Sequence, residues 1–367
     1  MSFQGVSVLF ALWLTLAIAP LAQGWGERGH NLIARVAARI LVQKSKDGRM
    51  LSPFLAKEHM LGHLANVPDI YFRGLGDISK DEGPTHYIDL EYLSTSPTML
   101  NLPLDFEKAT DLAAKNGKDL AKEVGTNPWR CKQLLRLMTE ALKEAKGSDS
   151  KSPRPSSELE EPVMKALTYA GILAHYLGDL AQPLHSTKDY DGWEAKQGGI
   201  HSYFEDSIVS ALNLSLDYEV FATALKEDPF KRILLNVPEV MRIKAKRDPV
   251  ALTMAMAIDS LSHIRQLLRL DRNNSLISQS KTTPIKIPAE RKPASAVAEN
   301  FRTLIVERLA LGADMVAYFW QMAWEDAGKP DLSSFRSHRY SLAPDYIQPD
   351  YLPLKPTATP PPLPTAP

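Results

Sequence analysis

The spacing of apolar residues is the feature that most limits the folds open to this chain. Between Asn31 and Val42, apolar side chains recur at the three- and four-residue steps of a helix, at Ile33, Val36, Ala37, Ile40 and Leu41. The same spacing recurs in five further segments, at 128–145, 163–180, 207–214, 249–268 and 296–327. No run of residues alternates convincingly between apolar and polar as a strand would. The sequence therefore predicts an all-α fold, with a single multi-helix domain over residues 25–330.

Three segments depart from this helical pattern. Residues 146–162, "KGSDSKSPRPSSELEEP", are polar and rich in Pro and Ser, and residues 273–295 carry scattered Lys and Pro. Such composition is typical of flexible surface insertions. Residues 331–367 form a Pro-rich C-terminal tail, which holds nine prolines from Pro344 onward. We expect that part of the tail to be extended and poorly ordered.

The N-terminus has the composition of a targeting segment. Residues 1–24 carry no charged side chain, and Val6 to Leu21 form a mostly apolar run that ends at Ala22-Gln23-Gly24. Small residues in that pattern predict a cleaved secretory signal peptide, although Lys and Arg are missing from its start. The alternative is an uncleaved N-terminal anchor. Cleavage would make Trp25 the first residue of a secreted or periplasmic protein.

The charge and cysteine content exclude attraction of polyanions by net charge and stabilisation by an internal disulfide. Lys plus Arg and Asp plus Glu each number 43, so no net charge attracts polyanions, and nucleic-acid binding would need a local patch. Cys131 is the single cysteine, so the chain cannot form an internal disulfide. An exported chain of this kind must be stabilised by packing, with or without bound metal.

One short stretch has the composition of a metal site. The segment "HYLGDLAQPLHS" places His175 and Asp179 four residues apart, on one face of a helix. Pro183 cannot continue that helix, so the chain turns and His185 can approach from another direction. Zinc commonly binds three or four such nitrogen and oxygen ligands. Taken alone, the His–Asp step is better explained by a solvated ion pair than by a metal site.

Further metal ligands occur in four other short motifs. "GGIHSYFED" supplies His201 and Glu205 at a second four-residue step, "ANVPDIYF" supplies Asp69, "PTHYIDLEY" supplies His86, and "WGERGH" supplies His30. Five of the nine histidines thus lie beside Asp, Glu, Gly or Pro in these motifs. The others, His59, His63, His263 and His338, are interpreted as ordinary core or surface residues.

These motifs, in this order from Trp25 to Glu205, resemble one superfamily. It contains the single-strand-specific zinc nucleases and the zinc-dependent phospholipases C. The resemblance implies an all-α fold with a trinuclear zinc cleft. By motif match, one ion would be held by Asp69, His86, His175 and Asp179, and a second by His185, His201 and Glu205. A third would be held by His30, by Asp179 as a bridging carboxylate, and by the amino nitrogen and carbonyl oxygen of a free Trp25 terminus.

The resemblance also implies a reaction. Zinc ions that share a water lower its pKa, so that a metal-bound hydroxide forms near neutral pH and attacks phosphorus in line. Asp69 and Asp179 are the residues predicted to be catalytic through this cluster. We find no convincing Ser-His-Asp or Cys-His arrangement, and a side-chain nucleophile is not required. The sequence therefore predicts zinc-dependent hydrolysis of phosphodiester bonds.

The sequence has features of two branches of the superfamily, the nucleases and the phospholipases C. The five-residue step from Trp25 to His30 and the "HYID" motif resemble the nucleases. In that branch Tyr87 would stack on a base and Asp89 would hydrogen-bond the base edge, although Tyr87 could equally be a packed core aromatic. Glu205 is typical of the phospholipases. The nucleases tend to have a basic residue at the position of Phe72. In this chain the basic residue, Arg73, comes one position later and is the candidate phosphate contact.

We therefore expect a secreted nuclease or 3′-nucleotidase with three zinc ions, acting on single-stranded nucleic acid or nucleotides. The alternative is a phospholipase C that acts on phospholipid headgroups, with Tyr190 and Trp193 as an aromatic rim. A remote alternative is a non-catalytic zinc-binding protein. No protein partner is implied, and a monomer is expected.

Overall fold

The computed structural model describes residues 25–45, 47–146, 154–235 and 237–352. The predicted signal peptide, at 1–24, lies outside the described residues. So do residues 353–367 of the Pro-rich tail and residues 147–153 of the first predicted insertion.

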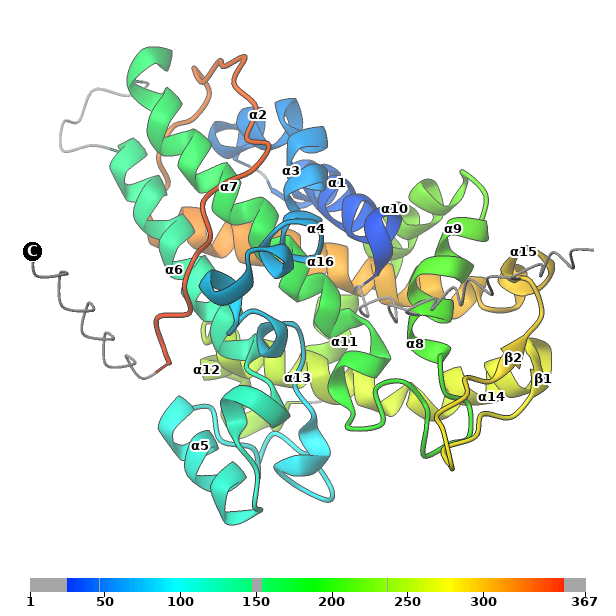
Figure 1. Ribbon diagram of the computed structural model, residues 1–367. Helices are drawn as coiled ribbons and strands as arrows, with labels where there is room; N and C mark the ends of the chain where they lie inside the picture. Colours follow the sequence, from blue (N-terminus) through cyan, green and yellow to red (C-terminus); the bar gives the residue numbers. More distant parts are fainter. Residues whose placement is uncertain (1–24, 46, 147–153, 236, 353–367) are drawn as a thin grey trace, which may run out of the picture.

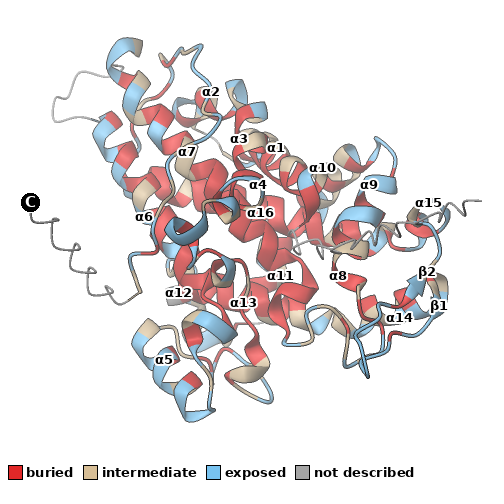
Figure 2. Cartoon of the chain, viewed as in Figure 1, coloured by how far each residue is buried: buried red, intermediate tan, exposed pale blue. Residues whose placement is uncertain are grey.

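Long helices form the centre of the fold. Helix α1 (Gly26–Lys44) packs against α16 (Arg302–Asp326), and α7 (Ser156–Ala181) lies between α16 and α6 (Asn127–Lys146) (Figure 1). Their facing sides are buried, as Figure 2 shows, because apolar residues recur there at helical spacing. The all-α prediction is confirmed.

Shorter elements surround this centre. The remaining α-helices are α2 (Gly48–Ala56), α3 (Glu58–Leu64), α4 (Val67–Ile70), α5 (Phe106–Lys115), α8 (Ile200–Ser202), α9 (Val209–Ala211), α10 (Leu216–Glu227), α11 (Pro229–Leu235), α12 (Glu239–Ala245), α13 (Pro249–Ser262), α14 (Ile264–Asn274) and α15 (Ala294–Val297). The 3-10 turns are η1 (Phe72–Gly74), η2 (Gly76–Ser79), η3 (Gly83–His86), η4 (Leu90–Tyr92), η6 (Pro183–Ser186) and η8 (Ala298–Asn300). Two π-helical segments are η5 (Leu120–Val124) and η7 (Tyr203–Ile208).

Glycines in α7 allow two neighbouring helices to approach closely. A Cβ atom on Gly171 would lie 2.4 Å from Cβ of Leu64 in α3, and one on Gly178 would lie 3.1 Å from Nδ1 of His30 in α1. Neither position has room for a larger side chain without movement of its neighbour. Close packing at Gly178 brings the side chain of His30 to the part of α7 that carries Asp179.

The structure corrects the predicted limits of the first insertion. Helix α7 begins at Ser156, so residues 156–162 are helical rather than part of a loop that extends to residue 162. Leu159 and Val163 are buried one turn apart, which extends the apolar face of α7 toward its N-terminus. The Pro and Ser content of this segment concealed that spacing.

The second predicted insertion, 273–295, also has regular structure. It contains β1 (Leu276–Ser278) and β2 (Glu290–Arg291), which pair antiparallel, so the absence of strands predicted from sequence is wrong for this hairpin. The Arg291 guanidinium Nε lies 2.9 Å from Oδ1 of the buried Asp271. That long-range pair fixes the hairpin, and strands this short show no alternation in the sequence.

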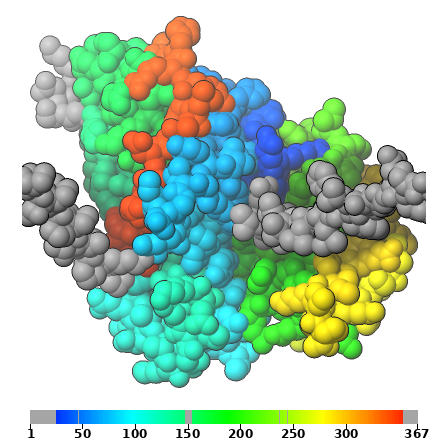
Figure 3. Space-filling model, in the orientation of Figure 1, coloured from blue at the N-terminus to red at the C-terminus, as the bar shows by residue number. Residues whose placement is uncertain are grey.

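The described part of the Pro-rich tail packs onto the domain. Leu332 and Phe335 are buried, and the amide of Leu332 donates a hydrogen bond of 2.8 Å to the Arg49 carbonyl. Farther along, Gln133 Nε2 donates to the Gln348 carbonyl at 2.6 Å. Figure 3 shows this orange and red segment lying across the green helices. The expectation of poor order from Pro344 onward is therefore wrong as far as residue 352.

The helix predicted over 249–268 is divided at His263 into α13 and α14.

Among the described residues, no individual helix is both long enough and apolar enough to span a membrane. Only the bent pair of segments 200–211 and 216–227, taken together, has the length and composition of a span.

Candidate metal centre

Helix α7 presents two ligands from one buried face. Nε2 of His175 lies 3.2 Å from Oδ2 of Asp179, and both side chains are fully buried. Pro183 then begins the turn η6, which returns His185 toward the helix, with Nδ1 3.9 Å from Oδ1 of Asp179. The geometry expected from "HYLGDLAQPLH" is therefore present.

A buried arginine holds the turn that follows α7. The Nε atom of Arg308, in α16, donates to the Ala181 carbonyl at 2.8 Å, and its NH1 donates to Oδ2 of Asp259 at 2.6 Å. Because the guanidinium is fully buried and charge-paired, it fixes the point where the chain leaves α7. This contact positions the segment that carries His185.

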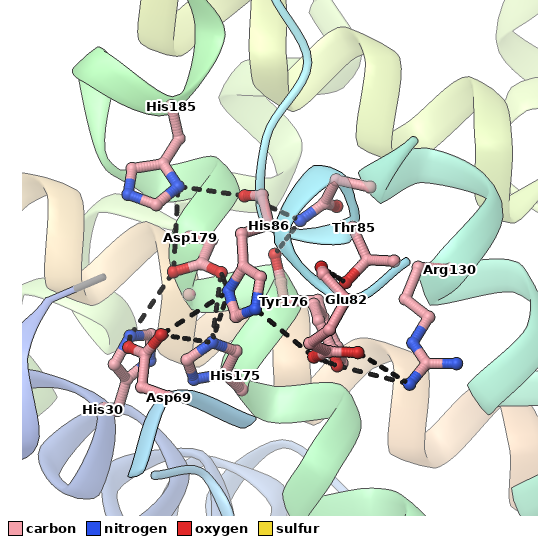
Figure 4. A network of polar contacts seen from close by, with 12 residues as sticks. His30, Asp69, Glu82, Thr85, His86, Arg130, His175, Tyr176, Asp179 and His185 are labelled. Carbon is pink, nitrogen blue, oxygen red and sulfur yellow. Dashed lines mark hydrogen bonds and ion pairs between the residues drawn. The ribbon is translucent and has the colours of Figure 1, made fainter. Parts of the chain in front are cut away.

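The first candidate ion site combines α7 with two short elements. Nδ1 of His86, at the end of η3, lies 2.9 Å from Nε2 of His175 and 3.0 Å from Oδ2 of Asp179. Asp69, in α4, places Oδ1 3.7 Å from the same His86 nitrogen. Figure 4 shows these side chains pointing toward one another. All four predicted ligands therefore meet, and His86, His175 and Asp179 form one compact group of potential metal ligands.

The second candidate ion site is formed by His185, His201 and Glu205. Nε2 of His201 lies 2.8 Å from Oε2 of Glu205 and 3.1 Å from Nε2 of His185. Gln182 donates from Nε2 to the same Glu205 oxygen at 2.7 Å. His201 is in α8 and Glu205 follows in the π-helical turn η7, so the four-residue step places both on one side.

His30 and Trp25, the predicted ligands of a third ion, both lie close to Asp179. Nε2 of His30 lies 3.4 Å from Oδ1 of Asp179 and 4.0 Å from Oδ2 of Asp69. The indole nitrogen of Trp25 donates to the Gly178 carbonyl at 2.8 Å, next to Asp179. The carbonyl of Trp25 accepts the Gly29 amide at 3.2 Å. The role of the Trp25 amino nitrogen and carbonyl as metal ligands stays a prediction.

Orphaned polar atoms test whether a metal fits these side chains. Within the described residues, both ring nitrogens of His30, Oδ1 of Asp179 and Oε1 of Glu205 are buried without a hydrogen-bond partner. Such atoms carry a desolvation penalty unless they find a partner. Nitrogen and carboxylate donors converging without cysteine match the ligands of catalytic zinc sites, so the residues fit that ion.

Backbone carbonyls orient three of the histidines. Nδ1 lies 2.7 Å from the Ala65 carbonyl in His175, 2.9 Å from the His86 carbonyl in His185, and 2.9 Å from the Tyr190 carbonyl in His201. A carbonyl can only accept, so Nδ1 carries a proton and Nε2 is the nitrogen left to bind a metal. These Nε2 atoms face the clustered donors, as metal-ligating histidines require.

The electrostatics of the cluster are strongly perturbed. Burial, with His175 nearby, lowers the pKa of His30 to about 4. Burial also raises the pKa of Glu205 to about 8. For His175, burial opposes protonation, but the Asp179 and Asp69 carboxylates outweigh it and raise the pKa to about 9. Burial thus disfavours the charged forms of both His30 and Glu205, and divalent cations would balance the carboxylate charge of the cluster.

A cavity of about 520 Å³ opens beside the ligands. It is lined by Arg73, Gly83, Pro84, His86, Tyr87, Asp89, Tyr92, Lys122, Glu123, Leu184, His185, Lys188, Tyr190 and His201. Nε of Arg73 lies 3.1 Å from Oδ1 of Asp69. The arginine one position later than expected therefore still brings positive charge to the centre.

The candidate substrate residues Tyr87 and Asp89 both line this cavity. Tyr87 is only partly buried. Asp89 is 5% exposed, and its Oδ1 has no hydrogen-bond partner among the described residues. Burial, with a smaller contribution from Glu91, raises the pKa of Asp89 to about 8. A buried carboxyl group with an unused oxygen is suited to hydrogen-bond a polar ligand.

Several residues that contact the metal ligands or line the cavity were not predicted from the sequence. Glu82 and Gln182 each contact a predicted ligand, and Lys122 and Lys188 line the cavity. Glu82 does stand four residues before His86, a step that also joins His175 to Asp179. In the polar run "DEGPTH" that spacing lacked the apolar periodicity that marks a helix face.

Comparisons with known proteins agree with this geometry. A sequence model of one protein family, described as S1/P1 nuclease, matches residues 25–234. The matched region covers more than half of the chain and includes every predicted metal ligand. Comparisons with curated proteins and with solved structures give no significant match.

Proposed function

Because the chain belongs to the S1/P1 nuclease family, a membership that implies a phosphodiester hydrolase, we propose that it is a zinc-dependent nuclease or 3′-nucleotidase that acts on single-stranded nucleic acid. The observation that carries the proposal is the position of Asp179. Its two carboxylate oxygens face different ligands, with Oδ2 3.0 Å from His86 and Oδ1 3.4 Å from His30. One carboxylate can therefore serve two neighbouring ions.

We assign the ligand residues to the three sets that the resemblance implies. His86, His175, Asp69 and Asp179 would hold one ion, and His185, His201 and Glu205 a second; His30, Asp179 and the Trp25 terminus would hold a third. When bound, zinc supplies an activated water and positive charge opposite the phosphate. Arg73 lies between Asp69 and the cavity, where its fixed charge can contact a phosphate oxygen.

The cavity favours a base over a lipid headgroup. Tyr87 offers an aromatic face, and Asp89 offers a buried carboxyl group whose Oδ1 has no hydrogen-bond partner among the described residues. Stacking contributes about 1–3 kcal/mol per base, and the carboxyl group can hydrogen-bond the base edge. The phospholipase alternative draws its support from Glu205 and from Tyr190, which is 52% exposed and also lines the cavity.

Export is part of the proposal. Cleavage after Gly24 would make Trp25 the N-terminal residue and expose an amine that metal can bind once it loses its proton. The tryptophan ring is buried and is hydrogen-bonded to Gly178, beside Asp179. This contact supports a chain start near the third ion.

A side-by-side assay tests the proposed function. The mature chain, beginning at Trp25, would be given single-stranded DNA, RNA, 3′-nucleotides and phosphatidylcholine, each with and without chelator. We expect chelator-sensitive hydrolysis of the nucleic-acid substrates, close to three zinc ions per chain, and little action on the lipid. Faster hydrolysis of phosphatidylcholine would establish the phospholipase alternative, and zinc binding without turnover on any substrate would establish the non-catalytic one.

A further inference from the structure

Glu82 is a buried carboxylate beside the first candidate metal site. It lies one residue before η3, and its side chain is 1% exposed. Oε1 of Glu82 lies 3.3 Å from Nε2 of His86, on the side of the imidazole ring opposite the metal ligands. Figure 4 shows Glu82 and Asp179 on opposite sides of the His86 ring.

The other contacts of His86 determine which nitrogen carries the proton. Nδ1 faces Nε2 of His175 and Oδ2 of Asp179, so it must keep a lone pair if it is to bind the ion. The proton then belongs on Nε2, where it needs an acceptor. Arg73 also approaches Nε2, at 3.5 Å, but a guanidinium can only donate. Glu82 supplies the acceptor at this nitrogen.

Two further buried side chains fix the Glu82 carboxylate. The Tyr176 hydroxyl donates to Oε1 at 2.5 Å, and NH2 of Arg130 lies 3.6 Å from Oε2. Arg130 in turn lies 3.3 Å from the Tyr176 hydroxyl oxygen and is fully buried. The carboxylate is thus held between α6 and α7 and cannot turn away from His86.

The choice of acceptor sets His86 apart from the other ligands. His175, His185 and His201 each direct their second ring nitrogen at a backbone carbonyl. A carboxylate is a stronger acceptor than a carbonyl, so it makes the imidazole a better electron donor toward a metal. In the first site, the ligand His86 therefore contacts a charged carboxylate, Glu82, on the side of its ring away from the metal position.

We propose that Glu82 is a positioning residue for the first zinc ion, which it serves by accepting the Nε2 proton of His86 and directing Nδ1 at Asp69, His175 and Asp179. The inference rests on the proposed function, because it requires that His86 binds metal. Arg130 and Tyr176 complete the arrangement, because they fix the carboxylate and balance its charge.

The test measures zinc retention directly. Wild type, Glu82→Gln and Glu82→Ala would be equilibrated with increasing chelator, and the zinc left per chain would be measured by mass spectrometry. We expect one of the bound ions to leave the variants at about 10- to 100-fold lower chelator concentration, with Ala at the upper end. The amide of Gln keeps the side-chain shape and one acceptor, so the Gln variant tests the idea even if the Ala variant does not fold.

A matched control separates positioning from general loss of packing. Asp314 is also a buried carboxylate, and its Oδ1 lies 2.6 Å from Nζ of Lys44 at the far end of α1. Asp314→Asn should lower the midpoint of thermal unfolding and leave zinc release unchanged. The proposal is overturned if both Glu82 variants release zinc as wild type does, or if Asp314→Asn shifts release equally.

A spectroscopic readout adds a second criterion. In zinc-loaded wild type labelled with ¹⁵N-histidine, the hydrogen-bonded Nε2 proton of His86 should give a downfield signal that Glu82→Ala removes. A signal that persists in this variant would show that another group accepts the proton. Failure of the proposed function has a different outcome, since wild type itself would then bind no zinc or hydrolyse no phosphodiester.

Discussion

Asp179 lies one helical turn after His175 on the buried face of α7, and their side-chain atoms approach to 3.2 Å. The other carboxylate oxygen of Asp179 faces His30, which comes from α1. A single side chain thus joins ligands from the first helix and from the centre of the fold.

Replacement of Asp179 tests that shared role. Asp179→Asn removes the charge but keeps the shape, and we expect at least a hundredfold loss of hydrolysis together with weaker binding of two ions. The effect follows because an amide oxygen is a poor bridge between two cations. Zinc content and turnover should be measured on the same preparation. Loss of a single ion, or activity near wild type, would contradict the bridging role.

An altered chain start tests the predicted terminal ligand. One additional glycine ahead of Trp25 would convert its amine into an amide, which cannot bind zinc in the same way. We expect the extended chain to lose one zinc ion and most of its activity while the helical content is unchanged. Circular dichroism and metal analysis check this, and full activity of the extended chain would show that the free terminus is dispensable.

Variants of the cavity wall should affect substrate binding rather than metal binding. Tyr87→Ala and Asp89→Asn should each raise KM for single-stranded substrates about 5- to 100-fold, which corresponds to a loss of roughly 1–3 kcal/mol of stacking or hydrogen bonding. The zinc content should stay at the wild-type value. Unchanged KM in both variants would favour a substrate without a base, and the phospholipase assay would then decide.

The sequence predicted the clustered His and Asp side chains better than the residues around them, because local helix spacing reveals the first and tertiary packing determines the second. His175 and Asp179 are close because a helix places residues four apart on one face, which spacing alone reveals. Glu82 and Arg130 meet only after the η3 segment packs against α6, and nothing local in "DEGPTH" indicates that contact. The hairpin at 276–291 was missed for a similar reason, because Arg291 in β2 is held by Asp271, which lies outside the strands in α14.

Helix limits were missed wherever tertiary contacts outweigh composition. Ser156 to Pro162 has the polar, Pro-containing character of a loop, yet burial of Leu159 keeps it helical. The tail has few apolar residues, but Leu332 and Phe335 are enough to anchor it. Both errors show that a small number of buried side chains can determine the structure of a segment that is otherwise polar.

Close packing of α3 on α7 makes Gly171 sensitive to substitution. In Gly171→Ala the added methyl group would lie 2.4 Å from Cβ of Leu64, so one helix must move. We expect a loss of about 1–3 kcal/mol in unfolding free energy, larger than the gain in helix propensity. Zinc binding should weaken as well, because His175 is oriented by the Ala65 carbonyl next to Leu64. Gly48→Ala, which meets no atom within 4 Å, is the control. Equal stability of the two variants would contradict this account.

The acid stability of the fold should depend on Glu307. The pKa of its carboxyl group is lowered to about 2 by His263, with a further contribution from Arg232. Because the folded pKa lies below the unfolded value of 4.5, the stabilisation is present above pH 4.5 and is lost as the pH falls toward 2.

Urea unfolding of wild type and Glu307→Gln at a series of pH values measures this contribution. We expect wild type to be more stable by about 1–2 kcal/mol at pH 6 and the difference to vanish near pH 2. Glu239→Gln, at an exposed position in α12, is the control for removal of a surface carboxylate. A gap between wild type and Glu307→Gln that does not change with pH would contradict the assignment.

The packing of α1 on α16 has a consequence for biosynthesis. His30 lies in α1, the first helix of the described residues, whereas α16 is made near the end of translation, and Lys44 and Asp314 join the two across 270 positions. Contacts between such distant parts of a chain form slowly, because a long loop must close first. The face of α1 that packs on α16 therefore stays uncovered until the last long helix has been made, and the region around His30 reaches its final packing only near the end of synthesis.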